Sequence, residues 1–238
     1  MTHYISSEGL TLKKIEEIIN TKADIALSED AIARIEKCRN YLNTKMETQK
    51  EPIYGVTTGF GSLCNISISK EELSQLQKNL VMSHACGVGD EVPCEIVKLM
   101  LLLKVQNFSF GYSGVQLETA QRLIDCYNSD ILPVVYQQGS LGASGDLCPL
   151  ANLMLPSVLG MGEVYYKGVK TDVSNVYIEK GWKPITLQSK EGLALLNGTQ
   201  FMSAYAIWNL LKAQRLSKQA DMVLALSLDA FDGRIEPF

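Results

Sequence analysis

The chain has 238 residues, of which 46% are hydrophobic and 20% are charged, a composition typical of a folded protein with one or two domains. Its 22 Lys and Arg against 26 Asp and Glu give a net charge of −4, which argues against a nucleic-acid-binding protein and against a polybasic membrane anchor. The six cysteines form no CxxC pair and there are two histidines, so neither a zinc site of standard spacing nor a disulfide scaffold is expected.

The first fifty residues have the pattern of two surface helices. Apolar residues recur at helical spacing between residues 10 and 19 and again between residues 32 and 42. Asp30 is the expected N-cap of the second helix. No apolar stretch of signal-peptide length precedes them, and we expect a soluble, reduced, cytoplasmic chain.

An irregular loop and three further helices follow. Residues 54–61 include three glycines in eight residues, which predicts a loop. Residues 69–72 have the form of a capping box and predict a helix that presents leucines on one face and carries His84 before Gly87 and Gly89 end it. Helical spacing returns around residues 95–108 and 115–128.

Residues 131–162 carry a single charge, Asp146, and are predicted to form a buried segment at the centre of a helical core. Prolines and glycines interrupt this segment, whereas a membrane-spanning helix needs about 20 continuous apolar residues. Asp146 followed by Pro149 predicts a helix start, with Asp146 as its N-cap and the proline in the first turn.

The last third predicts a hairpin and a long helix. Residues 163–170 read as a short β-hairpin that turns at Lys167 and Gly168, and helical spacing runs from about Thr199 towards Asp229. We expect a mainly α fold, with an N-terminal domain over residues 1–198 that leads into the start of a long-helix bundle over residues 199–238. No closing element follows this helix, as though more chain were expected.

Generic catalytic motifs are missing from the sequence. It has no GxxxxGK[ST] loop and no complete GxGxxG fingerprint. Residues 142–145, Gly-Ala-Ser-Gly, are similar to a nucleophile elbow, but GxSxG would need glycine where Asp146 stands. Taken alone, these four residues are most often a plain turn, and a serine hydrolase using Ser144 and His84 is an alternative.

A longer pattern is far more specific. Residues 139–151 read GSLGASGDLCPLA, and with residues 54–61, Ser83-His84 and residues 196–199 they resemble the aromatic amino acid ammonia-lyase family. This family acts on histidine, phenylalanine or tyrosine. The resemblance runs from about residue 4 to the end of the chain, although the family's chains are about twice as long.

The resemblance implies a prosthetic group, methylidene-imidazolone, formed by Ala143, Ser144 and Gly145, with no metal or diffusible cofactor. The residue types suit this chemistry, because glycine permits the tight turn in which the nitrogen of Gly145 attacks the carbonyl of Ala143. Ser144 supplies a hydroxyl that is lost as water. Packing must hold the turn in a strained shape, and helix N-termini directed at the ring would stabilise negative charge. Gly142 and Asp146 are implied to support the ring.

The same resemblance implies three further site residues. Tyr54 matches a loop tyrosine that is a candidate base for the β-proton; since a tyrosine has an ordinary pKa near 10, this role requires local lowering or a concerted transfer. His84 matches the position that faces the substrate side chain, and Asn197 a residue that helps to hold the amino-acid end of the substrate. The residues alone also allow purely structural roles: Tyr54 as a loop tyrosine packed on the core, His84 as a hydrogen-bonded core histidine, and Asn197 as a turn-forming asparagine.

Ser83-His84 resembles the histidine-specific members more than the corresponding pairs of the tyrosine and phenylalanine enzymes. The resemblance therefore implies elimination of ammonia from L-histidine to give trans-urocanate, as in histidine catabolism. A phenylalanine or tyrosine ammonia-lyase, or an aminomutase that moves the amino group, are alternatives. Cys148 and Asn152 depart from the pattern, since alanine is more usual at the first position and histidine is common at the second in histidine enzymes.

The family's second half supplies further active-site residues and much of the helix bundle through which tetramers assemble. The resemblance therefore also leaves open a catalytically incomplete fragment that serves only in folding or assembly. We expect a small amino acid as substrate, a homo-oligomer as the assembled state, and no nucleic-acid or membrane partner.

Overall fold

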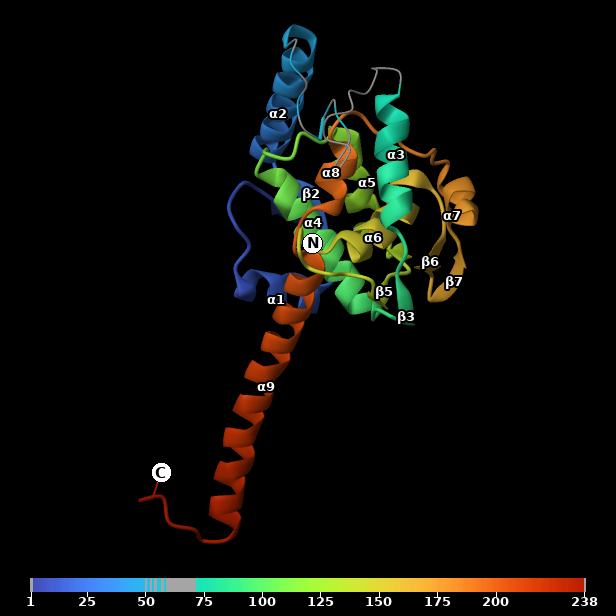
Figure 1. Cartoon of the computed structure of the whole chain (residues 1–238). Helices are drawn as coiled ribbons and strands as arrows, with labels where there is room; N and C mark the ends of the chain where they lie inside the picture. Colours follow the sequence, from blue (N-terminus) through green and yellow to red (C-terminus); the bar gives the residue numbers. More distant parts are fainter. Residues whose placement is uncertain are drawn as a thin grey trace.

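The computed structural model describes residues 2–49, 51, 53, 55–56, 58 and 72–237, and helices make up most of it (Figure 1). The helices are α1 (Leu12–Thr21), α2 (Glu29–Thr48), α3 (Leu73–His84), α4 (Cys94–Ser109), α5 (Leu117–Asn128), α6 (Leu147–Leu159), α7 (Val173–Lys180), α8 (Glu191–Leu196) and α9 (Gln200–Ala230). The strands are β1 (Thr2–Ile5), β2 (Asp24–Leu27), β3 (Val88–Glu91), β4 (Leu132–Pro133), β5 (Tyr136–Gln138), β6 (Glu163–Tyr166) and β7 (Val169–Asp172). The predicted mainly α fold is confirmed.

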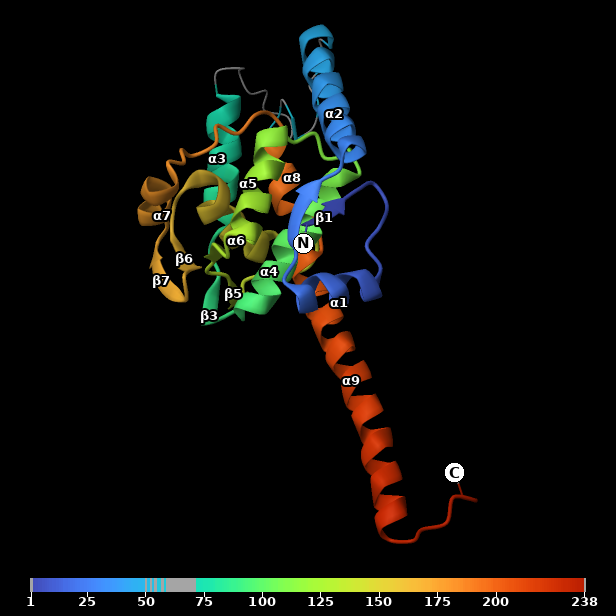
Figure 2. The ribbon, with the colours of Figure 1, turned by 180° about the vertical axis from the view of Figure 1, so that it is seen from behind.

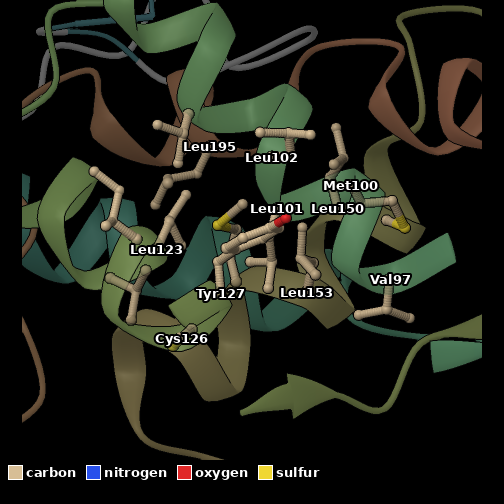
Figure 3. Packing of buried hydrophobic residues seen from close by; sticks show 14 of the residues in the cluster. Val97, Met100, Leu101, Leu102, Leu123, Cys126, Tyr127, Leu150, Leu153 and Leu195 are labelled. Carbon is tan, nitrogen blue, oxygen red and sulfur yellow. The ribbon is translucent and has the colours of Figure 1, made fainter. Parts of the chain in front are cut away.

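Helix α4 forms the centre of the hydrophobic core. Its sequence is apolar on almost every side, and it packs against α2, α5 and α9. Figure 3 shows Leu101 and Leu102 of α4 among apolar side chains from α5, α6 and α8. Each such buried leucine contributes about 1.5–3 kcal/mol through burial of apolar surface. The elements that carry the candidate site are therefore anchored to a rigid central helix.

The strands form three small sheets around the helices. β1 pairs with β2 in parallel, β3 pairs with β5 antiparallel, and β4, β6 and β7 form an antiparallel sheet in the order β4-β6-β7. The hairpin turns at Lys167 and Gly168, whose φ angles of 53° and 78° are those of a type I′ turn. This confirms the predicted hairpin.

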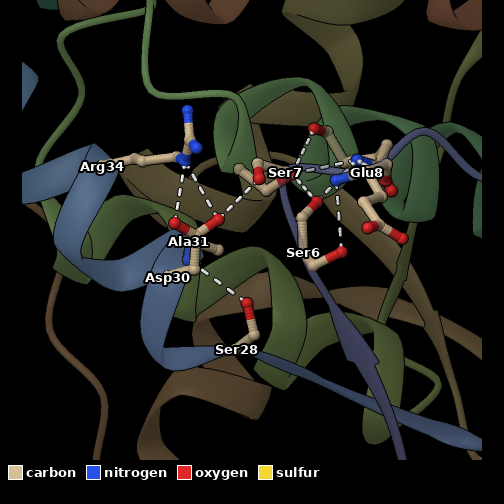
Figure 4. A network of polar contacts seen from close by, with 9 residues as sticks. Ser6, Ser7, Glu8, Ser28, Asp30, Ala31 and Arg34 are labelled. Atoms are coloured by element: carbon tan, nitrogen blue, oxygen red, sulfur yellow. Dashed lines mark hydrogen bonds and ion pairs between the residues drawn. The ribbon is translucent and has the colours of Figure 1, made fainter.

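The N-cap predicted for the second helix is wrong by two residues. α2 begins after Ser28, whose hydroxyl accepts a hydrogen bond from the N–H of Ala31 at 3.2 Å. Asp30 instead lies in the first turn, where it accepts from Arg34 and from the hydroxyl of Ser7 (Figure 4). Serine and aspartate are both strong N-cap residues, so the sequence alone does not separate their roles.

Helix α3 runs from Leu73 to His84 and confirms that a helix carries His84 near its end, while most of the predicted capping box, residues 69–71, lies outside the described residues. Its fully buried residues are Leu73, Gln77 and Val81. The buried face includes Gln77 because its Oε1 accepts the N–H of Gly192 in α8 at 2.9 Å. A Cβ at Gly192 would lie 2.9 Å from the Gln77 carbonyl oxygen, so this glycine allows α3 and α8 to pack closely.

The prediction of a continuously buried segment over residues 131–162 is wrong in its middle. Residues 131–135 and most of α6 are buried, but residues 137–144 are exposed. The absence of charge there reflects a glycine-rich turn rather than burial. Within the part of the chain that the structure describes, none of the helices combines the length and apolar character that crossing a bilayer requires.

Helix α9 confirms the long helix predicted at the end of the chain. Its first turns are anchored in the body, where Gln200 and Ala204 are buried and the helix packs on α4. The remainder extends away from the body (Figures 1 and 2). Leu216, Met222 and Leu226 are each at least 65% exposed. The proposed division of domains at residues 198 and 199 stays a prediction.

Candidate active site

Residues 142–145 form a tight turn between β5 and α6. Gly142 and Ala143 each form a backbone bridge with Gly145, and the φ angles of Gly142 and Gly145 are +81° and +98°. A Cβ on Gly145 would lie 2.4 Å from the carbonyl oxygen of Gly198 and 2.9 Å from its nitrogen. Glycine is thus needed at position 145 both for its backbone angle and for the close approach of the chain at Gly198.

The turn is held by the segment that joins α8 to α9. The Ser144 hydroxyl donates to Oδ1 of Asn197 at 3.0 Å, and the N–H of Asp146 donates to the carbonyl oxygen of Gly198 at 2.8 Å. Nδ2 of Asn197 donates to the carbonyl of Leu193 at 3.0 Å, which orients the amide so that its oxygen faces Ser144. The structure therefore brings together six of the predicted site residues: Gly142, Ala143, Ser144, Gly145, Asp146 and Asn197.

Asp146 occupies the N-cap position of α6 but does not cap that helix with its side chain, so this part of the prediction is wrong. Its Oδ2 instead accepts the N–H of Met202, in the first turn of α9, at 3.0 Å. Asp146 is only 3% exposed. It thus joins the beginnings of two helices beside the turn, and the positive ends of both helix dipoles lie there.

His84 ends α3, and its ring is half-buried. Its Nδ1 lies 2.8 Å from the carbonyl oxygen of Leu80 and 3.2 Å from the Ser83 hydroxyl. Because a carbonyl only accepts, Nδ1 donates to Leu80, and Nε2 is the ring nitrogen left for another contact. Across the described residues, no hydrogen bond joins His84 to the turn at 142–145. The predicted Tyr54 lies outside the described residues.

The chain that follows His84 packs on the base of the turn. A Cβ at Gly139 would meet the Cys148 sulfur at 2.5 Å and the Cα of Gly87 at 3.3 Å, and a Cβ at Gly87 would meet Nδ2 of Asn152 at 2.3 Å. Burial raises the pKa of the Cys148 thiol. The two departures from the family pattern, Cys148 and Asn152, therefore both lie where the end of α3 approaches the turn.

Lys104 is a buried residue near the site that the sequence analysis missed. It is 0% exposed in α4, and its Nζ donates to the carbonyl oxygen of Asn197 at 3.0 Å. Between residues 72 and 237, no carboxylate forms an ion pair with it. Burial lowers its pKa to about 7. Its position within the apolar run from Leu99 to Val105 is the sequence signal that would have identified it.

Lys104→Met is expected to stabilise the fold below pH 7 and to lose that advantage as the pH rises towards 10. The folded-state pKa of about 7 lies below the ordinary value of 10.5, so between these values the unfolded chain binds more protons. Wild-type stability then rises by up to about 1.4 kcal/mol per pH unit relative to the variant. Urea unfolding of both proteins at pH 6 and pH 9.5 measures this difference, and a constant difference would contradict it.

A buried carboxylate fixes the start of α8 and hence the position of Asn197. Glu191 is 0% exposed, and its Oε1 accepts the N–H of Gln116 at 2.9 Å and the Thr119 hydroxyl at 2.7 Å. Its Oε2 accepts the N–H of Gln188 at 2.8 Å and the side-chain amide of Gln116 at 2.6 Å. Each of the two carboxylate oxygens therefore accepts two hydrogen bonds.

Glu191→Gln is expected to lower the free energy of unfolding by about 1–3 kcal/mol, because its NH₂ group would face at least one buried N–H donor and leave that donor without an acceptor. Glu118→Gln is the matched control: it makes the same change at an exposed position on neighbouring α5 and should cost less than about 0.5 kcal/mol. Urea unfolding of the three proteins gives both values. Equal losses of stability in the two variants would show that removal of the charge, rather than of the buried acceptor, lowers the free energy of unfolding.

A separate cavity of about 310 Å³ lies between α1, α4, α5 and α9 and includes Lys98, Tyr127 and Trp208. It contains none of the residues of the turn or of the α8–α9 segment. Among the described residues, no group of three or more His, Cys, Asp or Glu side chains is arranged to hold a metal ion.

Known proteins resemble this chain in sequence and in fold. Residues 10–238 match the family model described as aromatic amino acid lyase. The chain belongs to this family. It is 42% identical over 234 residues to the histidine ammonia-lyase of Caldanaerobacter subterraneus subsp. tengcongensis, a match that covers 98% of this chain and 46% of the relative. The chain therefore spans about half the length of the curated relatives it matches.

Two solved structures of the aromatic amino acid lyase fold align closely with the chain. Histidine ammonia-lyase from Trypanosoma cruzi is 34% identical with a TM-score of 0.89, covering 98% of this chain and 45% of that one. Tyrosine aminomutase from Streptomyces globisporus is 31% identical with a TM-score of 0.89, covering 97% and 43%. The resemblance to the family inferred from the sequence is confirmed.

Proposed function

We propose that this chain forms the N-terminal part of an ammonia-lyase active site that eliminates ammonia from L-histidine to give trans-urocanate, a step of histidine catabolism. The observation that carries the proposal is the turn at Ala143, Ser144 and Gly145, held against Asn197 and Gly198. The name of the histidine ammonia-lyase relative at 42% identity supports histidine as the substrate. Ser83 and His84 support the same choice.

The turn suits the formation of methylidene-imidazolone. Ala143 and Gly145 are bridged, Gly145 has a φ of +98°, and the space where its Cβ would stand is filled by Gly198. In the proposed closure, the nitrogen of Gly145 bonds to the carbonyl carbon of Ala143 and one water leaves. The Ser144 hydroxyl leaves with its α-proton as a second water, which creates a C=C bond. The chain would then be lighter by two waters.

Once formed, this group supplies an electrophile that makes ammonium a better leaving group. Nε2 of His84 would contact the substrate side chain, since Nδ1 is held by the carbonyl of Leu80. Asn197 would hold the amino-acid end of the substrate. The beginnings of α6 and α9, joined by Asp146, would stabilise negative charge at the turn. Tyr54 is proposed as the base that accepts the β-proton.

The wider context is part of the same proposal. The exposed apolar residues of α9 support assembly into a homo-oligomer, with a tetramer as the expected state. The division at residues 198 and 199 would separate the domain that bears the turn from the start of the helical bundle. We further propose a cytoplasmic protein that needs no metal and binds neither nucleic acid nor membrane.

The test is an intact mass measurement on the purified chain, followed by addition of L-histidine with ultraviolet detection of urocanate. The expected mass is two waters below the value calculated from the sequence. A full, unmodified mass in well-folded protein would reject the proposal. A two-water deficit without urocanate would instead support a catalytically incomplete fragment.

An aminomutase is the second candidate, favoured by the structural likeness to tyrosine aminomutase from Streptomyces globisporus. Product analysis separates the two reactions, because an aminomutase yields a β-amino acid whereas a lyase releases ammonia. The same analysis with phenylalanine and tyrosine tests the other lyases. Faster consumption of phenylalanine or tyrosine than of histidine would contradict the proposal that histidine is the substrate.

A further inference from the structure

We propose that Lys104 is a positioning residue for ring closure, because its buried amine holds the backbone of Asn197 and Gly198 in the place from which they brace the turn. This inference rests on the proposed function, since it concerns the formation of the prosthetic group. Lys104 touches none of the reacting atoms of residues 143–145 in any hydrogen bond found among the described residues. Its action is through Asn197 and Gly198.

The segment at Asn197 and Gly198 is held from two sides. On one side, Nζ of Lys104 donates to the Asn197 carbonyl oxygen at 3.0 Å from the central helix α4. On the other side, the Asn197 amide receives the Ser144 hydroxyl and the Gly198 carbonyl receives the N–H of Asp146. The turn thus rests on a short segment that is itself fixed to the core by a lysine.

Stability does not explain an amine at this position. Lys104 is fully buried without a carboxylate partner in the described part of the chain, and a buried charge without a partner is costly. Burial holds the pKa of Lys104 near 7, so the cost is present at neutral pH. An apolar side chain of similar length would fill the same space at lower cost. Such a side chain would lack the hydrogen bond to Asn197 and the contact of Nζ with the Phe108 ring, whose centroid is 5.4 Å away, and only the hydrogen bond reaches the segment that holds the turn.

That hydrogen bond matters because ring closure is sensitive to position. The nitrogen of Gly145 must approach the carbonyl carbon of Ala143, and its placement is set by the close contact between Gly145 and Gly198. Ser144 must also present its hydroxyl, which Asn197 holds. A misplacement of about 1 Å between reacting groups typically costs roughly 10²-fold in rate. Releasing the Asn197–Gly198 segment from α4 should therefore slow closure.

The experiment follows ring closure in chains made by cell-free translation, sampled over time by intact mass. Lys104→Met removes the donor and is expected to lower the rate of two-water loss by at least about tenfold relative to wild type. Gln106→Met is the matched control, since Gln106 is a buried polar residue on the same helix that contacts Ser6 and Glu8 instead. It should close the ring at the wild-type rate. Circular dichroism establishes that each variant is folded.

The outcomes separate the two proposals. If wild type loses two waters and Lys104→Met does so at the same rate, the positioning role is wrong and the proposed function stands. If folded wild type keeps its full mass, both are wrong. If Gln106→Met slows closure as much as Lys104→Met, loss of any buried polar group on α4 is enough and the specific role of Lys104 is rejected.

A second measurement keeps the inference testable if Lys104→Met does not fold. The carbonyl of Asn197 and the N–H of Gly198 share one peptide group, so protonation of the lysine should shift the amide signal of Gly198. NMR of ¹⁵N-labelled wild-type chain across pH 5.5–9 is expected to show the Gly198 amide and the Lys104 Nζ titrating with the same midpoint, near 7. A Gly198 signal that does not follow the lysine would overturn the proposal.

Discussion

Ser144→Ala is expected to abolish the two-water mass deficit and, wherever the wild-type chain shows it, the elimination of ammonia. No hydroxyl remains to leave from residue 144, so closure alone removes at most one water and no C=C bond forms. Loss of a single preorganised donor already costs about 10²–10³-fold in rate, and loss of the electrophile itself should cost at least about 10³-fold. Intact mass and urocanate absorbance measure the two effects.

The fold should survive this substitution. Ser144 is exposed, and the hydrogen bond that it loses, to Oδ1 of Asn197, is worth about 1 kcal/mol at most in such a setting. Ser140→Ala is the matched control, because Ser140 is an exposed serine of the same loop. It should retain the two-water deficit. A Ser144→Ala protein that still lost two waters would place the chemistry on other residues.

The parts of this site that local sequence patterns predicted are those whose residues are neighbours in the chain, whereas His84 and Asn197 came only from the resemblance to the family. Residues 139–151 carry their pattern in one continuous stretch, and the apolar spacing of α4, α5 and α9 is set within each helix. A tight turn also demands specific residues, and glycine at position 145 meets that demand. Such features depend on local geometry, which sequence patterns record directly.

Two of the features that were missed depend on contacts across long separations. Lys104 donates to a backbone oxygen 93 residues away. Because every residue has a backbone carbonyl, the sequence does not identify this acceptor. Asp146 has the sequence context of a cap for α6, yet its carboxylate is used by α9, which begins more than 50 residues later. The uncharged stretch around the turn was interpreted as buried, whereas residues 137–144 are exposed. The first two features are set by tertiary contacts, whereas the third reflects the composition of the turn itself.

Gly145→Ala is expected to block ring closure and to destabilise the chain by more than the backbone angle alone requires. At a φ of +98° an alanine is strained by about 1–3 kcal/mol. Its Cβ would in addition lie 2.4 Å from the carbonyl oxygen of Gly198, a backbone atom that cannot move without disturbing its bond to Asp146. The turn must therefore open, which carries the Gly145 nitrogen away from Ala143.

Gly168→Ala separates these two contributions. Gly168 also has a positive φ, +78°, but a Cβ there would meet nothing within 4 Å, so its substitution reports the cost of the backbone angle alone. Urea unfolding should place Gly145→Ala below Gly168→Ala in stability, and intact mass should show the two-water deficit only in the latter. If both variants lost equal stability and both closed the ring, the close packing of Gly145 on Gly198 would not determine the shape of the turn. The proposal that the α8–α9 segment braces the turn would then lose its physical basis.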